Sequence, residues 1–487
     1  MTLEAYCWPV SVAPGEPVGL HVSSDHGTFD VEVAREGGER TVTWRAEGVR
    51  AERQDTPSDA SANGCGWTAA LEVPTGAEWR SGYHSVTLTA GDDRADAFFV
   101  VRPGPRDRAP ILLVLSTTTY QAYNDWGGPS LYTGGSRVSF ERPLAKGFLR
   151  KPEPAGRMMQ VVPDREAMGY RSWARPLGLS DWSGGAGWWN WERPFTRWAE
   201  AAGYGLDVAV SWDLERHPDL LDGHRLFVCV GHDEYWSWGM RDALDAFVAG
   251  GGNAAILSGN TCFWQVRFDG DHRGMTCFKY RADADPVLGT ADERFLSGVW
   301  SDRRIGRPET STIGLTFTRG GYSRYGLGAP ESSAAFTVHR PDHWVFEGTG
   351  LEAGQEFGGA DAIVAYECDG CALTSGVDGA PVPTHADGAP EGLEILATAP
   401  AYLIAQHEQP SRYAHEPGDL NFASTAIFGD DDAGHLAQLA DGHAVLGVFS
   451  RPGGGTVFNA GVIDWAVGLG DPVVDRITRN VLGRLAG

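Results

Sequence analysis

The hydrophobic period of the chain changes at PGPRDRAP, a segment rich in proline and charge that spans Pro103–Pro110. Before it, short runs such as FDVEVAR and HSVTLTA alternate apolar and polar residues and are separated by Gly, Pro and Asp. This alternation is typical of short strands joined by tight turns. It predicts an Ig-like antiparallel β-sandwich over residues 1–104. The proline-rich segment then acts as a linker, and residues 105–487 form a second domain.

After the linker, continuous apolar runs alternate with segments of helical spacing. The runs ILLVLS (Ile111–Ser116), LFVCVG (Leu226–Gly231) and NAAILSG (Asn253–Gly259) are typical of strands that are buried on both faces. The alternation of strand and helix predicts an α/β domain with a mostly parallel sheet flanked by helices. Residues of about 130–190 and 265–440 are rich in Gly, Pro and Trp and lack clean helical periodicity. We expect long insertions there, which add further strands.

Net charge and cysteine content limit the classes of partner and the cellular compartment that we expect for this chain. The 487-residue chain carries 40 Lys and Arg against 64 Asp and Glu, a formal net charge of −24. Such a surface repels polyphosphates and anionic lipids, so we expect neither nucleic acid nor a membrane as partner. Apolar runs stay shorter than the roughly 18 residues of a transmembrane helix. The seven cysteines are odd in number, and the first residues lack the basic and apolar regions of a secretory signal, so a cytoplasmic protein is predicted.

Polar and aromatic side chains gather directly after three of the predicted strands. The segments are TTTYQAYNDWGG (Thr117–Gly128), GHDEYWSW (Gly231–Trp238) and GNTCFW (Gly259–Trp264). In an open parallel sheet, ligands bind at the carboxyl ends of the strands. The predicted topology therefore brings these segments to one site.

In the second of these segments, His232 and Glu234 stand two residues apart. Residues at this spacing share a face of an extended chain, so both side chains can point into one cleft while Asp233 points away. A carboxylate there can bind a hard metal ion or act as a base. Asp233 or Ser237 can instead cap the helix that follows. Capping is favoured for Asp233, whereas for Glu234 a functional and a structural role are equally open.

Other candidate residues follow predicted strands as well. Tyr120 and Tyr123 follow the first buried run; phenolate is a strong ligand for ferric iron, because a trivalent ion offsets the cost of deprotonating a group of pKa about 10. Tyrosines are nevertheless more often core or interface residues. Asn260 can donate to a developing oxyanion or simply form a turn. Glu367, in IVAYECDGC, is on spacing alone more typical of an edge-strand carboxylate in solvent.

Several longer stretches resemble one family. TYQAYNDWGGPSLY, WERPFTRWAEAAGY, GHDEYWSWGMRDALDAFVAGGGN, ILSGNTCFWQVRF, AYECDG and GGTVFNAGVIDWAVGL are similar to the large (β) subunit family of N,N-dimethylformamidase. The resemblance spans about residues 105–487. It implies a glutamine-amidotransferase-like α/β core and a mononuclear Fe(III) site whose ligands are two tyrosines and one glutamate. It also implies a small companion subunit and leaves a homo-oligomer open.

The resemblance assigns roles to individual polar residues. Glu234 in HDE matches the carboxylate ligand of the iron, and His232 matches the residue that supports it. Asn260 in SGNT and Glu367 in YECDG match polar residues beside the ligands. These assignments are expectations that follow from the resemblance.

The tyrosine ligands are assigned less sharply. Tyr123 in AYN is the best match for one ligand, and Tyr120 competes with it. Tyr132 in SLY and Tyr170 in MGYRSW are both open as the second ligand. In WERPF, relatives often carry Tyr where this chain has Arg193, so the second ligand is absent here if that tyrosine is the one required.

Together these expectations describe iron-dependent hydrolysis of a small N-substituted amide. The ion would polarise the carbonyl and lower the pKa of a water molecule. Glu367 or His232 would take the proton of the water, and Asn260 would stabilise the oxyanion. Three tryptophans would form an apolar wall for N-alkyl groups: Trp126, Trp236 and Trp264.

Two other functions stay open from the sequence. SGNTC occupies the elbow that holds the nucleophile of the glutamine-amidotransferase core, and Cys262 lies just beyond that position, so a hydrolase using Cys262 is one alternative. The other is a non-catalytic protein that binds carbohydrate or a partner through its tryptophans. The substrate itself is open among small formamides, larger N-substituted amides and a biosynthetic intermediate.

Overall fold

The computed structural model describes residues 2–105, 108–158, 169–324, 332–408 and 417–487. These residues form two compact units. The first holds the described residues up to Arg157, those from 169 to His224, and Phe268–Thr276. The second holds Arg225–Arg267 and the described residues of Cys277–Gly487. The division of the sequence after residue 104 stays a prediction.

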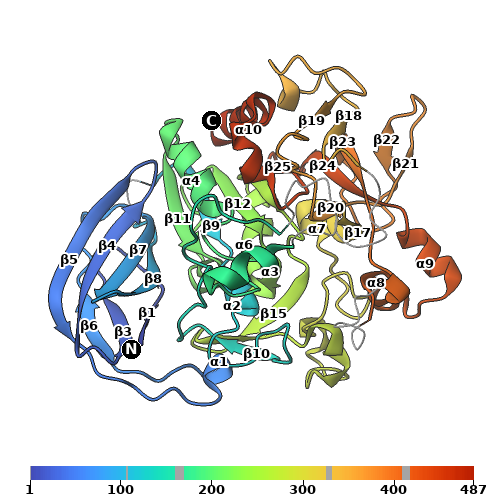
Figure 1. The fold of residues 1–487 in the computed structure, drawn as a ribbon. Coiled ribbons are helices and arrows are strands. Elements are labelled where there is room, and N and C mark those ends of the chain that lie inside the picture. The colour runs from blue at the N-terminus through green and yellow to red at the C-terminus, as the bar shows by residue number, and fades with distance from the viewer. Residues whose placement is uncertain (1, 106–107, 159–168, 325–331, 409–416) are drawn as a thin grey trace. The chain divides into compact units, whose positions relative to one another are not determined.

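The first hundred residues of the first unit are rich in strands (blue in Figure 1). The strands are β1 (Leu3–Trp8), β2 (Ser11–Val12), β3 (Val18–Ser24), β4 (Thr28–Glu36), β5 (Arg40–Arg50), β6 (Ala69–Val73), β7 (Gly82–Ala90) and β8 (Asp93–Val101). They form one sheet of order β1-β3-β6 and another of order β2-β8-β7-β4-β5. Neighbouring strands are antiparallel except for β2 and β8, which are parallel.

One hydrophobic cluster is shared by these two sheets. Leu20 of β3 and Val31 and Val33 of β4 are all at most 2% exposed and belong to it. In β4, the polar side chains of Asp30 and Glu32 alternate with Val31 and Val33, as the period of two in a strand requires. Each such buried side chain is worth about 1.5–3 kcal/mol relative to exposure. The alternation that predicts strands here therefore also builds the core.

The rest of the first unit adds helices and a parallel strand pair. Its elements are α1 (Ala60–Asn63), β9 (Ile111–Leu115), α2 (Thr117–Tyr123), β10 (Arg137–Ser139), α3 (Tyr170–Ala174), α4 (Glu192–Ala201), β11 (Leu206–Val210), α5 (Asp213–Arg216) and β16 (Gly274–Thr276). Strands β9 and β11 pair in parallel, and every residue of β9 is buried, which confirms the strand predicted from ILLVLS. Helix α2 follows β9 almost at once, and all of its residues are buried.

The second unit begins with a strand, a helix and a strand. Its elements are β12 (Leu226–His232), β13 (Tyr235–Ser237), α6 (Trp238–Ala249), β14 (Asn253–Gly259), β15 (Trp264–Phe268), α7 (Thr310–Ile313), β17 (Thr316–Tyr322), β18 (Phe336–Val338), β19 (Glu356–Phe357), β20 (Glu367–Gly370), β21 (Leu373–Ser375), β22 (Pro381–Pro383), β23 (Glu394–Ala401), α8 (Asp419–Phe428), α9 (Ala433–Leu439), β24 (Gly442–Ser450), β25 (Thr456–Asn459) and α10 (Pro472–Ala486). Its main strands follow the order β12-β14-β25-β24-β23-β18-β19. Strands β17 and β20 form an antiparallel pair that packs against β24 (Figure 1).

The prediction of a mostly parallel, glutamine-amidotransferase-like sheet is wrong. Strands β12, β14 and β25 are parallel, but β24, β23, β18 and β19 continue the order antiparallel. The protein consists mainly of mixed and antiparallel sheets with many strands. The error has a physical reason: a strand buried on both faces is a continuous apolar run whatever the direction of its neighbours. EILATAPA of β23 lies within the region expected as an insertion, yet it supplies a strand of the main sheet.

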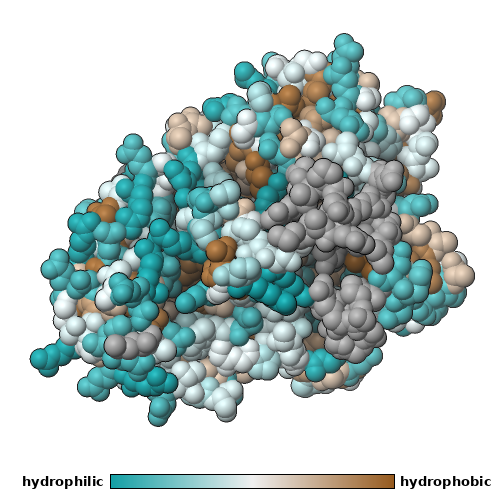
Figure 2. Space-filling model, viewed as in Figure 1, coloured by the Kyte–Doolittle hydropathy of each residue, from teal (hydrophilic) through white to brown (hydrophobic). Residues whose placement is uncertain are grey.

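Hydrophilic and intermediate residues dominate the face shown in Figure 2, and hydrophobic residues appear there in small separate spots. Among the described residues, no helix combines the length and the apolar character needed to cross a bilayer.

Candidate active site

The segment GHDEYWSW bridges the end of β12 and the start of α6. His232 is the last residue of β12, and Glu234 lies in the short connection before β13. The cap of α6 is Ser237, whose side chain accepts a hydrogen bond from Met240 N at 3.2 Å. Of the two capping residues considered from the sequence, Ser237 therefore fills the role, and the carboxylates of this segment are not needed for it.

Four of the predicted site residues meet in the second unit, and we call them the His232 cluster: His232, Glu234, Asn260 and Glu367. His232 Nε2 lies 2.9 Å from Glu367 Oε2 and 3.3 Å from Glu234 Oε2. Asn260 Nδ2 donates to Glu367 Oε2 at 3.3 Å. The side chains of the histidine and both glutamates are at most 5% exposed. The cluster thus joins the ends of β12 and β14 to the start of β20.

Trp264 is joined to this cluster by its indole. Trp264 Nε1 donates to Glu234 Oε1 at 2.6 Å, and the Trp264 side chain is buried. A hydrogen bond to a carboxylate is roughly twice as strong as one between neutral groups, so it fixes the rotamer of Glu234. Two carboxylates beside one histidine concentrate negative charge in a buried place, which favours a proton or a cation there.

Two further buried residues near the cluster are missing from the sequence prediction. Lys279 Nζ donates to Tyr235 Oη at 2.9 Å and lies 4.9 Å from the centre of the Trp264 ring. Asp369 in β20 accepts a hydrogen bond from Thr261 N at 3.1 Å. Asp369 had a signal, because it stands two residues after Glu367 and residues at that spacing share a strand face. A single lysine in CFKY carries no such signal.

Cys262 is buried beside the cluster's loop, and burial raises the pKa of its thiol far above the usual value. A thiolate is the reactive form of cysteine, so this environment disfavours Cys262 as a nucleophile.

In the first unit, Tyr123 pairs with Tyr132. Tyr132 Oη donates to Tyr123 Oη at 2.7 Å, and the ring centres are 4.2 Å apart. The close approach also needs Gly185, because a Cβ there would come within 2.8 Å of the Tyr123 ring. Two phenol oxygens therefore lie side by side at the end of α2.

The competing tyrosines have other contacts. Tyr120 Oη donates to the buried carboxylate of Glu192 at 2.5 Å. Tyr170 Oη lies 2.7 Å from Ser183 Oγ, and burial raises the pKa of Tyr170 to about 12. The Arg193 guanidinium lies 3.7 Å from the centre of the Trp189 ring.

The remaining predicted tryptophans pack in their own units. Trp236 is fully buried and donates from Nε1 to Asp233 O at 3.1 Å. Trp126, in the first unit, is half-buried and donates from Nε1 to Glu4 Oε1 at 2.8 Å.

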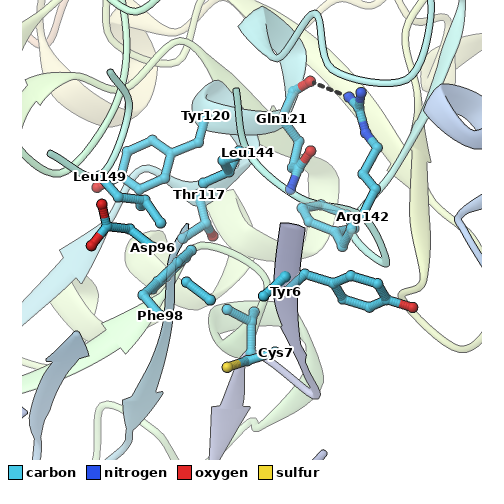
Figure 3. A pocket seen from close by; sticks show the side chains of 14 residues that line it. Tyr6, Cys7, Asp96, Phe98, Thr117, Tyr120, Gln121, Arg142, Leu144 and Leu149 are labelled. Atoms are coloured by element: carbon cyan, nitrogen blue, oxygen red, sulfur yellow. Dashed lines mark hydrogen bonds between the residues drawn. The ribbon is translucent and has the colours of Figure 1, made fainter. Parts of the chain in front are cut away.

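A small pocket of about 20 Å³ lies in the first unit (Figure 3). Apolar side chains such as Phe98 and Cys7 line most of it, and Tyr120 and Gln121 of α2 form another side. Arg142 also lines it and donates from Nη2 to Gln121 O at 3.2 Å. None of the sequence patterns predicts this cavity.

The chain matches known proteins over most of its length. Residues 30–478 match the family described as N,N-dimethylformamidase beta subunit-like, C-terminal. A protein of Paracoccus aminophilus named N,N-dimethylformamidase beta subunit is 25% identical over 451 residues, covering 86% of this chain and 54% of the relative. A protein of the same name from Alcaligenes sp is 24% identical over 462 residues, with the same coverage of 86% and 54%. The chain thus spans about half the length of these relatives. On the strength of the match over residues 30–478, the chain belongs to the N,N-dimethylformamidase beta subunit-like family.

Proposed function

We propose that this chain hydrolyses small N-substituted amides such as N,N-dimethylformamide, and that the His232 cluster is the centre of its active site. The observation that carries the proposal is the cluster itself. A histidine, two carboxylates and an amide are buried together in a member of a family whose relatives are named after an amide hydrolase. Proton transfer at neutral pH requires groups of this kind at hydrogen-bond distance from one another.

Each unit offers oxygen donors of the kind that a hard metal ion prefers, and we propose one Fe(III) as cofactor. Glu234 offers a buried carboxylate whose direction is fixed by Trp264. Tyr123 and Tyr132 offer phenol oxygens that lie 2.7 Å apart. Within the second unit, Glu234 would be the carboxylate ligand of the ion. Within the first unit, Tyr123 and Tyr132 are the candidate phenol ligands, with Tyr132 preferred over Tyr120 and Tyr170 because of this pairing. When bound, the ion would supply Lewis acidity, which polarises an amide carbonyl and acidifies water.

Proton transfer in this mechanism falls to the histidine and the second carboxylate. Glu367 takes a proton from the attacking water as the water oxygen bonds to the amide carbon. His232 Nε2 lies within hydrogen-bond distance of Glu367, so the pair can share that proton until the carbon–nitrogen bond breaks. The proton then passes to the leaving amine. The products are a carboxylic acid and an amine, and no other reactant is consumed.

Asn260 orients the groups that react. Its Nδ2 donates to Glu367, and its Oδ1 is buried without a hydrogen-bond partner among the described residues. A buried polar atom without a partner costs free energy, which an incoming donor recovers. We propose that Oδ1 accepts a hydrogen bond from the attacking water. Within the second unit, the faces of Trp264 and Trp236 are our candidates for the apolar wall that receives N-alkyl groups. The half-buried Trp126 of the first unit stays a candidate for substrate binding by itself.

Metal analysis and kinetics test this function. The purified chain should contain about one iron and show a visible phenolate-to-iron band, and it should release dimethylamine from N,N-dimethylformamide. Glu234→Ala should lose iron, the band and at least about 99% of kcat/KM, whereas Glu352→Ala, at an exposed glutamate of the same unit, should retain all three. A colourless, iron-free chain with full activity contradicts the iron site. An iron-loaded chain that leaves small amides intact contradicts the hydrolase.

The relatives are named beta subunits, which supports a second kind of subunit in the active assembly. We propose that this chain associates with a small companion polypeptide, and a homo-oligomer stays a second option. Light scattering measures the mass of the chain purified alone and of the complex purified from its native source, and these masses give the number of copies and any companion.

A further inference from the structure

Asp369 is a buried carboxyl whose hydrogen bond goes to the backbone of a neighbouring loop. It is fully buried in β20, two residues after Glu367. Its Oδ2 accepts from Thr261 N at 3.1 Å, and its Oδ1 is buried without a hydrogen-bond partner among the described residues. One side chain thus binds the backbone of the loop that follows β14.

That loop has a conformation that needs support. Asn260 has a φ of 49° and Cys262 a φ of 56°, both in the left-handed region that side chains with a Cβ disfavour. Such backbone persists only where surrounding contacts fix it. Two backbone hydrogen bonds tie the loop to the segment after β12: Cys262 N donates to Asp233 O at 2.8 Å, and Trp264 N donates to Glu234 O at 2.9 Å. Asp369 supplies a further contact, which ties the loop to β20.

The position of the Asn260 side chain depends on this backbone. Its Nδ2 reaches Glu367 Oε2 at 3.3 Å, near the limit of a hydrogen bond. The two backbones also approach closely, because a Cβ at Gly259 would lie 2.8 Å from Glu367 O. A small rotation at Asn260 would therefore break its bond to Glu367.

We infer that Asp369 is a positioning residue, which clamps the backbone at Thr261 to β20 and so holds the amide of the preceding residue, Asn260, against Glu367. Asp369 stands on the same strand as Glu367, so the clamp sets the distance between the two groups directly. Its effect on catalysis rests on the proposed amide hydrolysis, but its effect on geometry does not.

A structural experiment tests the clamp without any assay of activity. Crystal structures of Asp369→Ala and Asp369→Asn are compared with the wild type, together with hydrogen–deuterium exchange of the peptide that contains Thr261. In Asp369→Ala we expect Asn260 to leave the left-handed region, its bond to Glu367 to open, and exchange to rise at least about 10-fold. Asp369→Asn keeps one acceptor oxygen, so its changes in conformation and exchange should lie between those of the wild type and those of Asp369→Ala. Should Asp369→Ala fail to fold, Asp369→Asn decides alone.

Kinetics with N,N-dimethylformamide tests the consequence. We expect kcat to fall about 100-fold in Asp369→Ala and about 10-fold in Asp369→Asn, with KM changed by less than about 3-fold, because a displaced catalytic group lowers the rate more than it lowers substrate binding. Asp285→Asn is the matched control. Asp285 is also buried and accepts from a loop backbone, Ser297 N at 2.9 Å, but it lies outside the cluster. Its kcat should stay at the wild-type value.

The outcomes separate the two proposals. An unchanged Asn260 φ and unchanged exchange in the Asp369 variants overturn the clamp, whatever the activity. Equal losses of kcat in the Asp369 and Asp285 variants also overturn it, because they indicate a general loss of structure. A wild type that leaves the amide intact overturns the proposed function, while the crystal structures still decide the clamp.

Discussion

Glu309 is a residue whose chemistry the fold changes strongly. It is fully buried in the second unit, and Ser301 Oγ donates to it at 3.0 Å. Burial is the main cause that raises the pKa of Glu309 from 4.5 to about 7. The folded protein therefore keeps a proton on this carboxyl that the unfolded chain releases at lower pH.

This difference predicts a pH dependence of stability. Between pH 4.5 and about 7, folded Glu309 binds more proton than unfolded Glu309, so its contribution to the free energy of unfolding falls as pH rises. The fall is at most about 1.4 kcal/mol per pH unit. Asp369, whose pKa burial raises to about 8, adds a slope of the same sign to every variant. Urea denaturation across this range should therefore show a steeper slope in the wild type than in Glu309→Gln, and both curves should run parallel above pH 8. Glu352→Gln, at an exposed glutamate, should keep the wild-type slope. An equal slope in the wild type and Glu309→Gln would assign the difference to another group.

At the scale of elements, the residue that caps α6 differs from the polar residues that follow β12 and belong to the His232 cluster. Ser237 takes the cap, so Glu234 is left to face His232 and Trp264. The helix and the site segment are thus separate in their hydrogen bonds although they are adjacent in sequence.

Removal of the cap should therefore cost stability. Ser237→Ala leaves the N–H of Met240 without its side-chain acceptor, and we expect a loss of about 1 kcal/mol in the free energy of unfolding. Chemical denaturation measures the loss, and Ser375→Ala, at an exposed serine of β21, should stay within about 0.5 kcal/mol of the wild type. Equal stability of both variants would contradict the capping role.

At the scale of the whole molecule, net charge governs association. A formal charge of −24 opposes binding to any polyanion. Fluorescence anisotropy with a labelled DNA duplex at low salt should show no binding up to about 100 μM protein, where ordinary non-specific binders are already saturated. Binding that weakens as salt is added would contradict this expectation.

Much of the local structure follows from the residues themselves. The alternation in β3 and β4 predicts strands and their buried faces, and the apolar runs of β9, β12 and β14 predict buried strands. Periodicity does not encode strand direction, so the antiparallel half of the main sheet was missed. The tyrosines show the same limit. Tyr120 and Tyr123 share a short helix, yet one contacts Glu192 and the other Tyr132.

The sequence by itself determined several buried strands such as β9, β12 and β14, the acidic character, and the two-residue spacing that places His232 and Glu234 on one face. Those properties depend on neighbours along the chain. Tertiary structure decided the direction of the strands, the meeting of Glu367 with His232 over 135 positions of sequence, and the clamp of Asp369 on the Asn260 loop. These depend on long-range burial and backbone hydrogen bonds, which no local pattern encodes.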